Sequence, residues 1–180
     1  MPNIFMKTPH HIFTWDKLGD IREGRSDLGE EMPVAVYRMM QYSLNHVLAE
    51  TYGVEQADAL FRRAGHLSGT EFAKNVLQLN LPLDAFVAHL QQVLREMRIG
   101  ILRIEQLEDA GGLIVLTVAQ DLDCSGLPPT GEVVCCFDEG FLSGVLEAYT
   151  SKPYEVREID CWASGDRVCR FRCRVADNAN

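Results

Sequence analysis

The segment from Cys135 to Cys173 contains five of the six cysteines of this 180-residue chain and constrains its fold more than any other stretch. Its last part, REIDCWASGDRVCRFRC, has two runs with β-branched and aromatic residues on either side of a Ser-Gly-Asp turn sequence. This pattern predicts a β-hairpin. With the turn centred on Gly165, Cys161 and Cys169 lie directly opposite each other, with Cβ atoms about 4.5–5.5 Å apart. The chain therefore has to fold so that these two thiols meet.

Two more residues near the hairpin can bind a metal ion together with these thiols. Glu158 lies three residues before Cys161, and Cys135 precedes a predicted helix that would pack across the hairpin. Cysteine thiolates bind zinc at about 2.3 Å in tetrahedral sites. Three sulfurs and one carboxylate make a four-coordinate set, so the sequence predicts a structural Zn²⁺ site formed by Cys135, Glu158, Cys161 and Cys169.

The position of Glu158 sets a condition on this site. Residues three apart in a regular strand face opposite sides of the sheet. Glu158 and Cys161 can therefore bind one ion only if a β-bulge near Asp160 re-aims a side chain. Without a bulge, a water molecule or Cys136 would complete the site. The alternatives to metal binding are a redox-active or structural disulfide and plain buried thiols, since cysteine is among the most buried residue types.

The same segment resembles a known family. The positions that carry the resemblance are Cys135, Gly140, Ser143, Gly144, Pro153, the Arg-Glu-Ile-Asp-Cys run that ends at Cys161, and the interval to Cys169. Over roughly residues 29–174 the chain is similar to the 4-vinyl-reductase domain family. The resemblance implies a small-molecule-binding module like the sensor domains of bacterial regulators that bind phenols and related aromatics. It also implies the zinc ligands named above and a fold similar to Golgi vesicle-tethering subunits and haem-based nitric oxide sensors.

The resemblance further implies a cavity for a small apolar or aromatic ligand beside the metal site. The positions that line the pocket in the aromatic-sensing relatives correspond to Ile114, Leu142, Val145, Val156 and Phe171. Ile114 stands where a relative anchors the phenol hydroxyl, which does not favour phenol itself. The alternative is that these five residues form ordinary core.

Composition and charge narrow the class of protein. The chain is 47% hydrophobic with a net charge of −9 and a pI near 5.0, which argues against nucleic acid and anionic membranes as partners. It begins without a signal-peptide pattern and has no stretch near the ~20 apolar residues of a spanning helix. We therefore expect a cytoplasmic protein, in which thiols stay reduced and available to a metal.

Hydrophobic periodicity predicts the remaining elements. We expect α+β architecture in the order α-α-α-β-β-α-β-β, with N-terminal helices packed on a four-stranded antiparallel sheet. Residues 1–25 are expected to be an N-terminal arm for dimerisation, and residues 26–176 a single ligand-binding domain. The expected helices cover residues 30–52, 55–77, 83–98 and 138–151, and the strands 99–107, 113–118, 154–161 and 167–174.

Two pairs of glycines stand four residues apart within predicted helices. Gly65 and Gly69 each cost about 1 kcal/mol relative to alanine, and we expect a kink or a break there, with close approach of another backbone as the alternative. Gly140 and Gly144 open one side of the later helix, where a strand or a ligand could lie close.

The predicted function follows from what the site can and cannot do. Three thiolates and a carboxylate leave no open coordination position, which is typical of structural zinc. The chain has no glycine-rich phosphate loop and no G-x-S-x-G motif, so we do not expect an enzyme. We expect a zinc-stabilised sensor domain, a homodimer with a possible downstream signalling partner. The alternatives are a tetrapyrrole-related vinyl reductase or its accessory protein, and an adaptor without ligand.

Overall fold

A computed structural model describes residues 12–108 and 112–176, and the chain divides into two compact units, Met1–Glu31 and Met32–Asn180. Residues 1–11 of the predicted arm and 109–111 of the predicted hairpin loop lie outside the described residues. Within the first unit, two short helices are present, the 3-10 helix η1 (Trp15–Leu18) and α1 (Ile21–Gly24). Its role in dimerisation stays a prediction.

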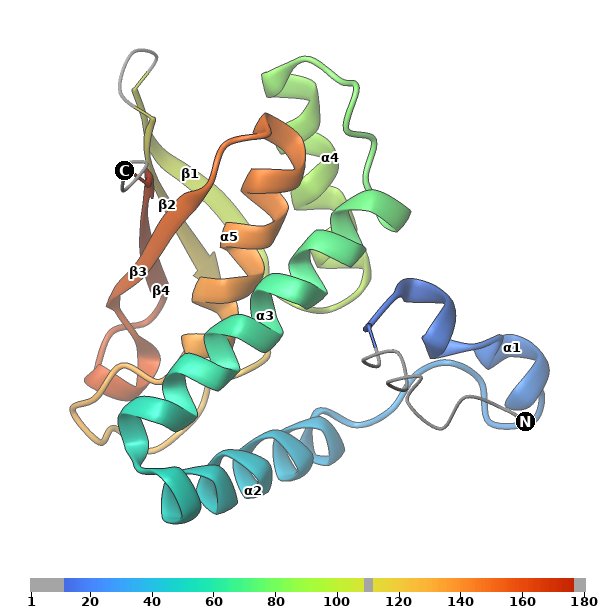
Figure 1. Cartoon of the computed structure of the whole chain (residues 1–180), viewed down its shortest axis with the longest axis vertical. Helices are drawn as coiled ribbons and strands as arrows, with labels where there is room; N and C mark the ends of the chain where they lie inside the picture. Colours follow the sequence, from blue (N-terminus) through green and yellow to red (C-terminus); the bar gives the residue numbers. More distant parts are fainter. Residues whose placement is uncertain (1–11, 109–111, 177–180) are drawn as a thin grey trace, which may run out of the picture. The chain divides into compact units, whose positions relative to one another are not determined.

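The second unit has the predicted α+β class and the predicted order of elements (Figure 1). Its four strands form one antiparallel sheet in the order β1-β2-β4-β3. The elements are α2 (Val34–Tyr52), α3 (Val54–Val76), α4 (Leu83–Glu96), β1 (Ile101–Leu107), β2 (Leu113–Ala119), α5 (Cys136–Thr150), β3 (Tyr154–Asp160), the 3-10 helix η2 (Trp162–Ser164) and β4 (Cys169–Val175).

The helices of the second unit are layered on one face of the sheet. Helix α5 lies against the sheet, α3 packs along α5 on its other side, and α4 contacts β1 (Figure 1). The inward residues of β4 alternate with exposed arginines, so that Cys169, Phe171 and Cys173 are fully buried. This period of two follows from the pleat of a strand and places the cysteines on the covered face of the sheet.

The expected kink in the second helix is wrong. Helix α3 is continuous, and Gly65 and Gly69 lie directly against α5. A Cβ atom on Gly65 would stand 2.0 Å from the carbonyl oxygen of Phe137. On the facing helix, a Cβ on Gly140 would stand 1.9 Å from the carbonyl oxygen of Arg62. The four glycines therefore let the two helix backbones touch, and the pair on α5 does not make room for a ligand.

The β3–β4 connection also differs from the expected tight hairpin. Strand β3 ends at Asp160, and η2 follows before β4 starts at Cys169. Gly165 ends η2 with a φ of 109°, a conformation that glycine adopts readily. Cys161 and Cys169 are therefore not a cross-strand pair, but they lie at the two ends of one connection.

None of the described helices is both long and apolar enough to cross a membrane.

Candidate metal centre and apolar cavity

Four buried cysteines from four separate segments converge at one end of the sheet. Cys135 precedes α5, Cys161 precedes η2, Cys169 begins β4, and Cys124 lies in the loop after β2. Each has an exposed fraction of 1% or less. The ends of these elements meet here because β2, β4 and β3 are neighbours in the sheet and α5 starts across them.

The spacing of the four sulfurs suits tetrahedral coordination. The Cys135 Sγ lies 3.9 Å from that of Cys161 and 3.8 Å from that of Cys169, and the Cys124 Sγ lies 3.0 Å from that of Cys169. All four sulfurs lie within 4.8 Å of one another. Thiolates bound to zinc at about 2.3 Å in a tetrahedron stand about 3.8 Å apart. These four side chains could hold a metal ion.

Sequence reasoning missed Cys124 as a member of this cluster. It lies in an irregular loop, eleven residues before Cys135, and we had no spacing rule that joins the two. The loop is shaped by Asp121, whose Oδ1 accepts hydrogen bonds from the backbone N–H groups of Asp123 at 2.8 Å and of Cys124 at 3.1 Å. An aspartate followed two residues later by another aspartate is a signal for such a turn.

Glu158 lies beside the cluster, and the condition set on it by the sequence is met. The β3–β4 register shifts between Glu158 and Asp160, so the expected β-bulge is confirmed and both Glu158 and Cys161 turn inward. Glu158 Oε2 accepts a hydrogen bond of 3.0 Å from the backbone N–H of Cys135. Its Oε1 is buried without a hydrogen-bond partner among the described residues. Ligation by Glu158 stays a prediction.

Buried carboxyl groups surround the thiols. Burial raises the pKa of Asp121 to about 7 and that of Glu158 to about 8, and it raises that of Asp138 well above its usual range. Asp138 Oδ2 is buried and lacks a hydrogen-bond partner within the described part of the chain. So much acidic chemistry in a low-dielectric site suits a divalent cation, which would stabilise the ionised forms.

The thiols differ from one another in acidity. Hydrogen bonding with Cys124, Cys135 and Cys169 lowers the pKa of the Cys161 thiol. Hydrogen bonding with the other members of the cluster, Cys124 first, raises the pKa values of Cys135 and Cys169. Cys161 is therefore the first of these three to become a thiolate, the form that binds a metal.

The two remaining cysteines lie outside the cluster. The half-buried Cys136 Sγ accepts a hydrogen bond of 3.4 Å from Arg62 Nη2, and burial raises the pKa of its thiol to about 12. Cys173 is buried in the sheet between Ile114 and Val156, and burial raises its pKa to about 12. Both thiols are protonated at neutral pH.

Helix α2 is tied to the loop that carries Cys124. Tyr37 and Gln41 donate hydrogen bonds of 2.8 and 2.6 Å to the two carboxylate oxygens of Asp123. The Arg38 guanidinium donates to the carbonyl oxygens of residues 121, 122 and 125, and the Tyr42 hydroxyl donates to that of Asp123. No residue of α2 is buried. Its attachment to this loop is therefore made by polar side chains.

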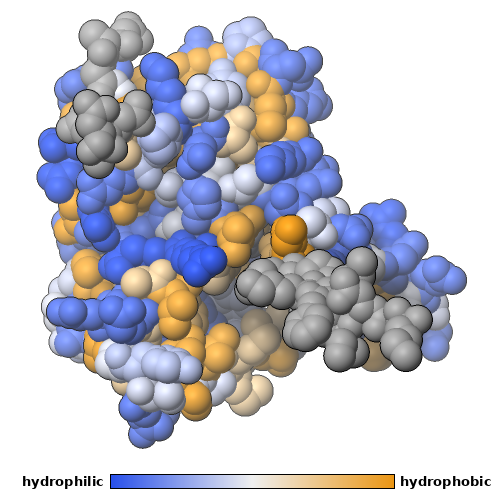
Figure 2. Space-filling view, in the orientation of Figure 1, coloured by the Kyte–Doolittle hydropathy of each residue, from blue (hydrophilic) through white to orange (hydrophobic). Residues whose placement is uncertain are grey.

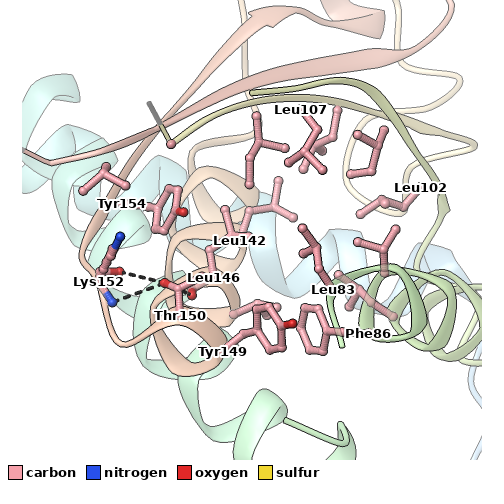
Figure 3. Close-up of a pocket in the computed structure, with 18 of the residues that line it drawn as sticks. Leu83, Phe86, Leu102, Leu107, Leu142, Leu146, Tyr149, Thr150, Lys152 and Tyr154 are labelled. Atoms are coloured by element: carbon pink, nitrogen blue, oxygen red, sulfur yellow. Dashed lines mark hydrogen bonds between the residues drawn. The ribbon is translucent and has the colours of Figure 1, made fainter. Parts of the chain in front are cut away.

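An apolar cavity of about 420 Å³ lies between the sheet, α4 and α5 (Figure 3). It is separate from the thiol cluster, because none of the four clustered cysteines lines it. Three of the five predicted ligand residues line it, namely Ile114, Leu142 and Val145. Val156 and Phe171 are buried core residues outside its lining, so their contact with a ligand stays a prediction. Sequence reasoning missed α4, which contributes Leu83, Phe86, Val87 and Leu90.

Comparison with known proteins agrees with this combination of fold and thiol spacing. Residues 114–175 match the family model of the vinyl-4-reductase domain, a stretch that runs from β2 to the end of β4. The chain carries a vinyl-4-reductase domain. The resemblance to the 4-vinyl-reductase domain family is thus confirmed over this stretch, which includes Cys135, Glu158, Cys161 and Cys169. The MJ1642 protein of Methanocaldococcus jannaschii is 28% identical over 152 residues, which cover 84% of this chain and 83% of the relative.

Solved structures share the fold of this vinyl-4-reductase domain protein. The phenol-responsive sensory domain of the transcription activator PoxR, solved with phenol, has a TM-score of 0.60 at 18% identity, with 87% of this chain and 90% of that chain covered. A vinyl-4-reductase family protein from Methanocaldococcus jannaschii has a TM-score of 0.59 at 16% identity, with 97% and 99% covered. Trafficking protein particle complex subunit 3 from Naegleria fowleri, covalently bound to palmitic acid, has a TM-score of 0.64 at 14% identity, with 80% and 95% covered.

Proposed function

We propose that this protein is a zinc-stabilised, small-molecule-binding sensor domain that holds a largely apolar ligand in the cavity between α4, α5 and the sheet. The observation that carries this proposal is the cavity itself. Protein interiors are normally packed without voids of this size, whereas ligand sites are concave, mostly apolar and about 300–1,000 Å³ in volume. A space of about 420 Å³ lined by aliphatic and aromatic side chains fits that description.

The metal would have a structural role. Cys124, Cys135, Cys161 and Cys169 would hold the zinc ion, with Glu158 and Asp138 close by. Four thiolates fill a tetrahedral site and leave no position for a substrate. When bound, the ion would join the loop after β2, the start of α5 and both ends of the β3–β4 connection. Because α5 also forms one wall of the cavity, the metal would keep that wall in place.

The two alternatives are less well supported. An adaptor without ligand was expected if the cavity were filled by side chains, and a cavity of about 420 Å³ argues against that reading. A vinyl reductase would need an electron donor, and the support for it is the name of the family. A preparation that carries a coloured tetrapyrrole would favour the reductase alternative, whereas a colourless zinc protein would favour the sensor.

The experiment that tests the function combines metal analysis with ligand detection on the purified protein. We expect about one zinc per chain and a small apolar molecule released on denaturation, identified by mass spectrometry. Val145 is completely buried and lines the cavity, so Val145→Trp should fill it and remove the bound molecule while leaving the zinc content unchanged. Absence of any bound molecule, together with no thermal shift from phenols, tetrapyrroles or fatty acids, would overturn the proposal.

A further inference from the structure

The polar groups of the cavity lie at one end of it. Glu108 and Lys152 are exposed at the rim, and Thr150 and Tyr154 lie next to Lys152 (Figure 3). This end is formed by the β1–β2 connection and the C-terminal end of α5. The opposite walls are aliphatic or aromatic. They are formed by Leu90 of α4, Leu102 of β1, Leu116 of β2, and Leu142 and Val145 of α5, all of them buried.

The deep part of the cavity offers no free polar partner to a ligand. Among the described residues, the buried side-chain N and O atoms without a hydrogen-bond partner belong to Gln41, Thr70, His89, Asp138 and Glu158, and none of these lines the cavity. The Tyr149 hydroxyl, which is close to the stacked ring of Phe86, already donates a hydrogen bond of 3.0 Å to the carbonyl oxygen of Leu81. A ligand hydroxyl buried there would lose its hydrogen bonds to water without replacement, which is costly.

From this division of polar and apolar lining we infer that the natural ligand is an amphipathic monocarboxylate, with its apolar tail among Leu102, Leu142 and Val145 and its carboxylate beside Lys152. This inference rests on the proposed function and adds the chemical class of the ligand. A phenol-like molecule would place its hydroxyl inside an apolar wall, whereas a carboxylate at the rim stays hydrated and next to a cation.

Lys152 decides the sign of the head group. It is the one cationic side chain among the described lining residues, and it makes no ion pair with a described residue. The Thr150 hydroxyl exchanges hydrogen bonds with the Lys152 backbone and donates to the carbonyl oxygen of Leu146, so it holds the chain of Lys152 at the rim. The acid at the same rim, Glu108, already accepts a hydrogen bond of 2.8 Å from Gln106 Nε2. An anionic head is therefore favoured on the Lys152 side.

Three probes with the same tail and different heads test this inference: decanoate, decanol and decylamine. Their affinities are measured by displacement of the neutral dye Nile red from the full-length protein at low salt. Decanoate is expected to bind more tightly than decylamine. Lys152→Gln should weaken decanoate by about two- to five-fold, the range of one exposed ion pair, and leave decanol unchanged.

Glu108→Gln is the matched variant, since it removes the opposite charge from the same exposed rim. It should strengthen decanoate and weaken decylamine, again without an effect on decanol. High salt should reduce the difference between the charged probes, because exposed charges are screened within about 10 Å at 0.1 M. In a series from octanoate to dodecanoate, each methylene group should add about four-fold in affinity until the cavity is filled.

The outcomes separate this inference from the proposed function. Equal binding of all three heads, all abolished by Val145→Trp, would overturn the carboxylate assignment and leave the ligand cavity in place. An equal loss for all three probes in Lys152→Gln would also overturn it, because the side chain would then act through structure. Failure of every probe to displace Nile red would overturn both.

Discussion

The Tyr37 hydroxyl donates a hydrogen bond of 2.8 Å to Asp123 Oδ1 and joins helix α2 to the loop that carries Cys124. Cys124 is the next residue after Asp123, so the position of α2 and that of the fourth thiol depend on the same few peptide units. A metal ion bound to Cys124 would hold this loop, and with it the attachment of α2.

The first prediction concerns this attachment. Tyr37→Phe should lower the free energy of unfolding by about 1–2 kcal/mol, because it leaves a buried carboxylate oxygen without its donor. It should also speed the loss of zinc to a chelator, measured with a colorimetric metal indicator. Ser43→Ala is the control on the same helix, because Ser43 donates only to the carbonyl oxygen of Met40 one turn earlier. Equal rates of zinc loss in the two variants would show that α2 and the metal are not coupled.

The second prediction identifies the fourth ligand. The four-thiol geometry predicts that Cys124→Ser loses zinc and that Glu158→Gln retains it, because the glutamine can still accept the hydrogen bond from Cys135 N–H. Zinc per chain is measured by atomic emission after gel filtration. The opposite result, with zinc retained in Cys124→Ser and lost in Glu158→Gln, would support the ligand set predicted from the sequence.

The third prediction concerns the ligands on which the sequence and the geometry agree. Cys161→Ser and Cys169→Ser should each lose the metal and lower the thermal midpoint, because structural zinc contributes directly to the free energy of folding. Cys136→Ser and Cys173→Ser are controls outside the cluster and should keep one zinc per chain. A variant of Cys161 or Cys169 with full zinc content would remove that residue from the ligand set.

The fourth prediction concerns the contact between α3 and α5. Gly140→Ala should cost at least about 1–3 kcal/mol, the usual range for an overpacked core, because its Cβ would meet a backbone oxygen of α3 that cannot move aside. Gly24→Ala is a helical control with no atom within 4 Å of the added Cβ, and it should be close to neutral. Both are measured by urea denaturation. An unchanged midpoint in Gly140→Ala would mean that the helices pack less closely than described.

The fifth prediction concerns the proposed homodimer. Helix α2 exposes Val36, Met39, Met40, Leu44 and Val47, and Figure 2 shows orange apolar side chains among blue ones over this segment. We expect light scattering to give twice the chain mass, and Met39→Glu with Met40→Glu to give the monomer with zinc retained, because charged residues are depleted from interface cores. A monomeric wild-type protein would contradict the dimer.

Local patterns in the sequence determined much of this protein. The helical and strand periods predicted the α+β class and the order of the elements, since each side chain's face depends only on its position in a regular backbone. The spacing from Glu158 to Cys161 required a β-bulge, and the bulge is present between Glu158 and Asp160. Cys135, Cys161 and Cys169 could be grouped because each stands at the end of an element that a local pattern reveals.

Only the tertiary structure decided the rest, because it depends on which distant segments touch. Cys124 joins the cluster through a loop with no periodicity, and Gly65 and Gly140 serve one helix contact that neither sequence window contains. The cavity exists because the side chains of α4, α5 and the sheet do not fill the space between them, and a sum of volumes across separate elements cannot be read from any one of them. Its polar end likewise arises where the end of α5 meets the end of β1, which brings Lys152 and Glu108 to one rim.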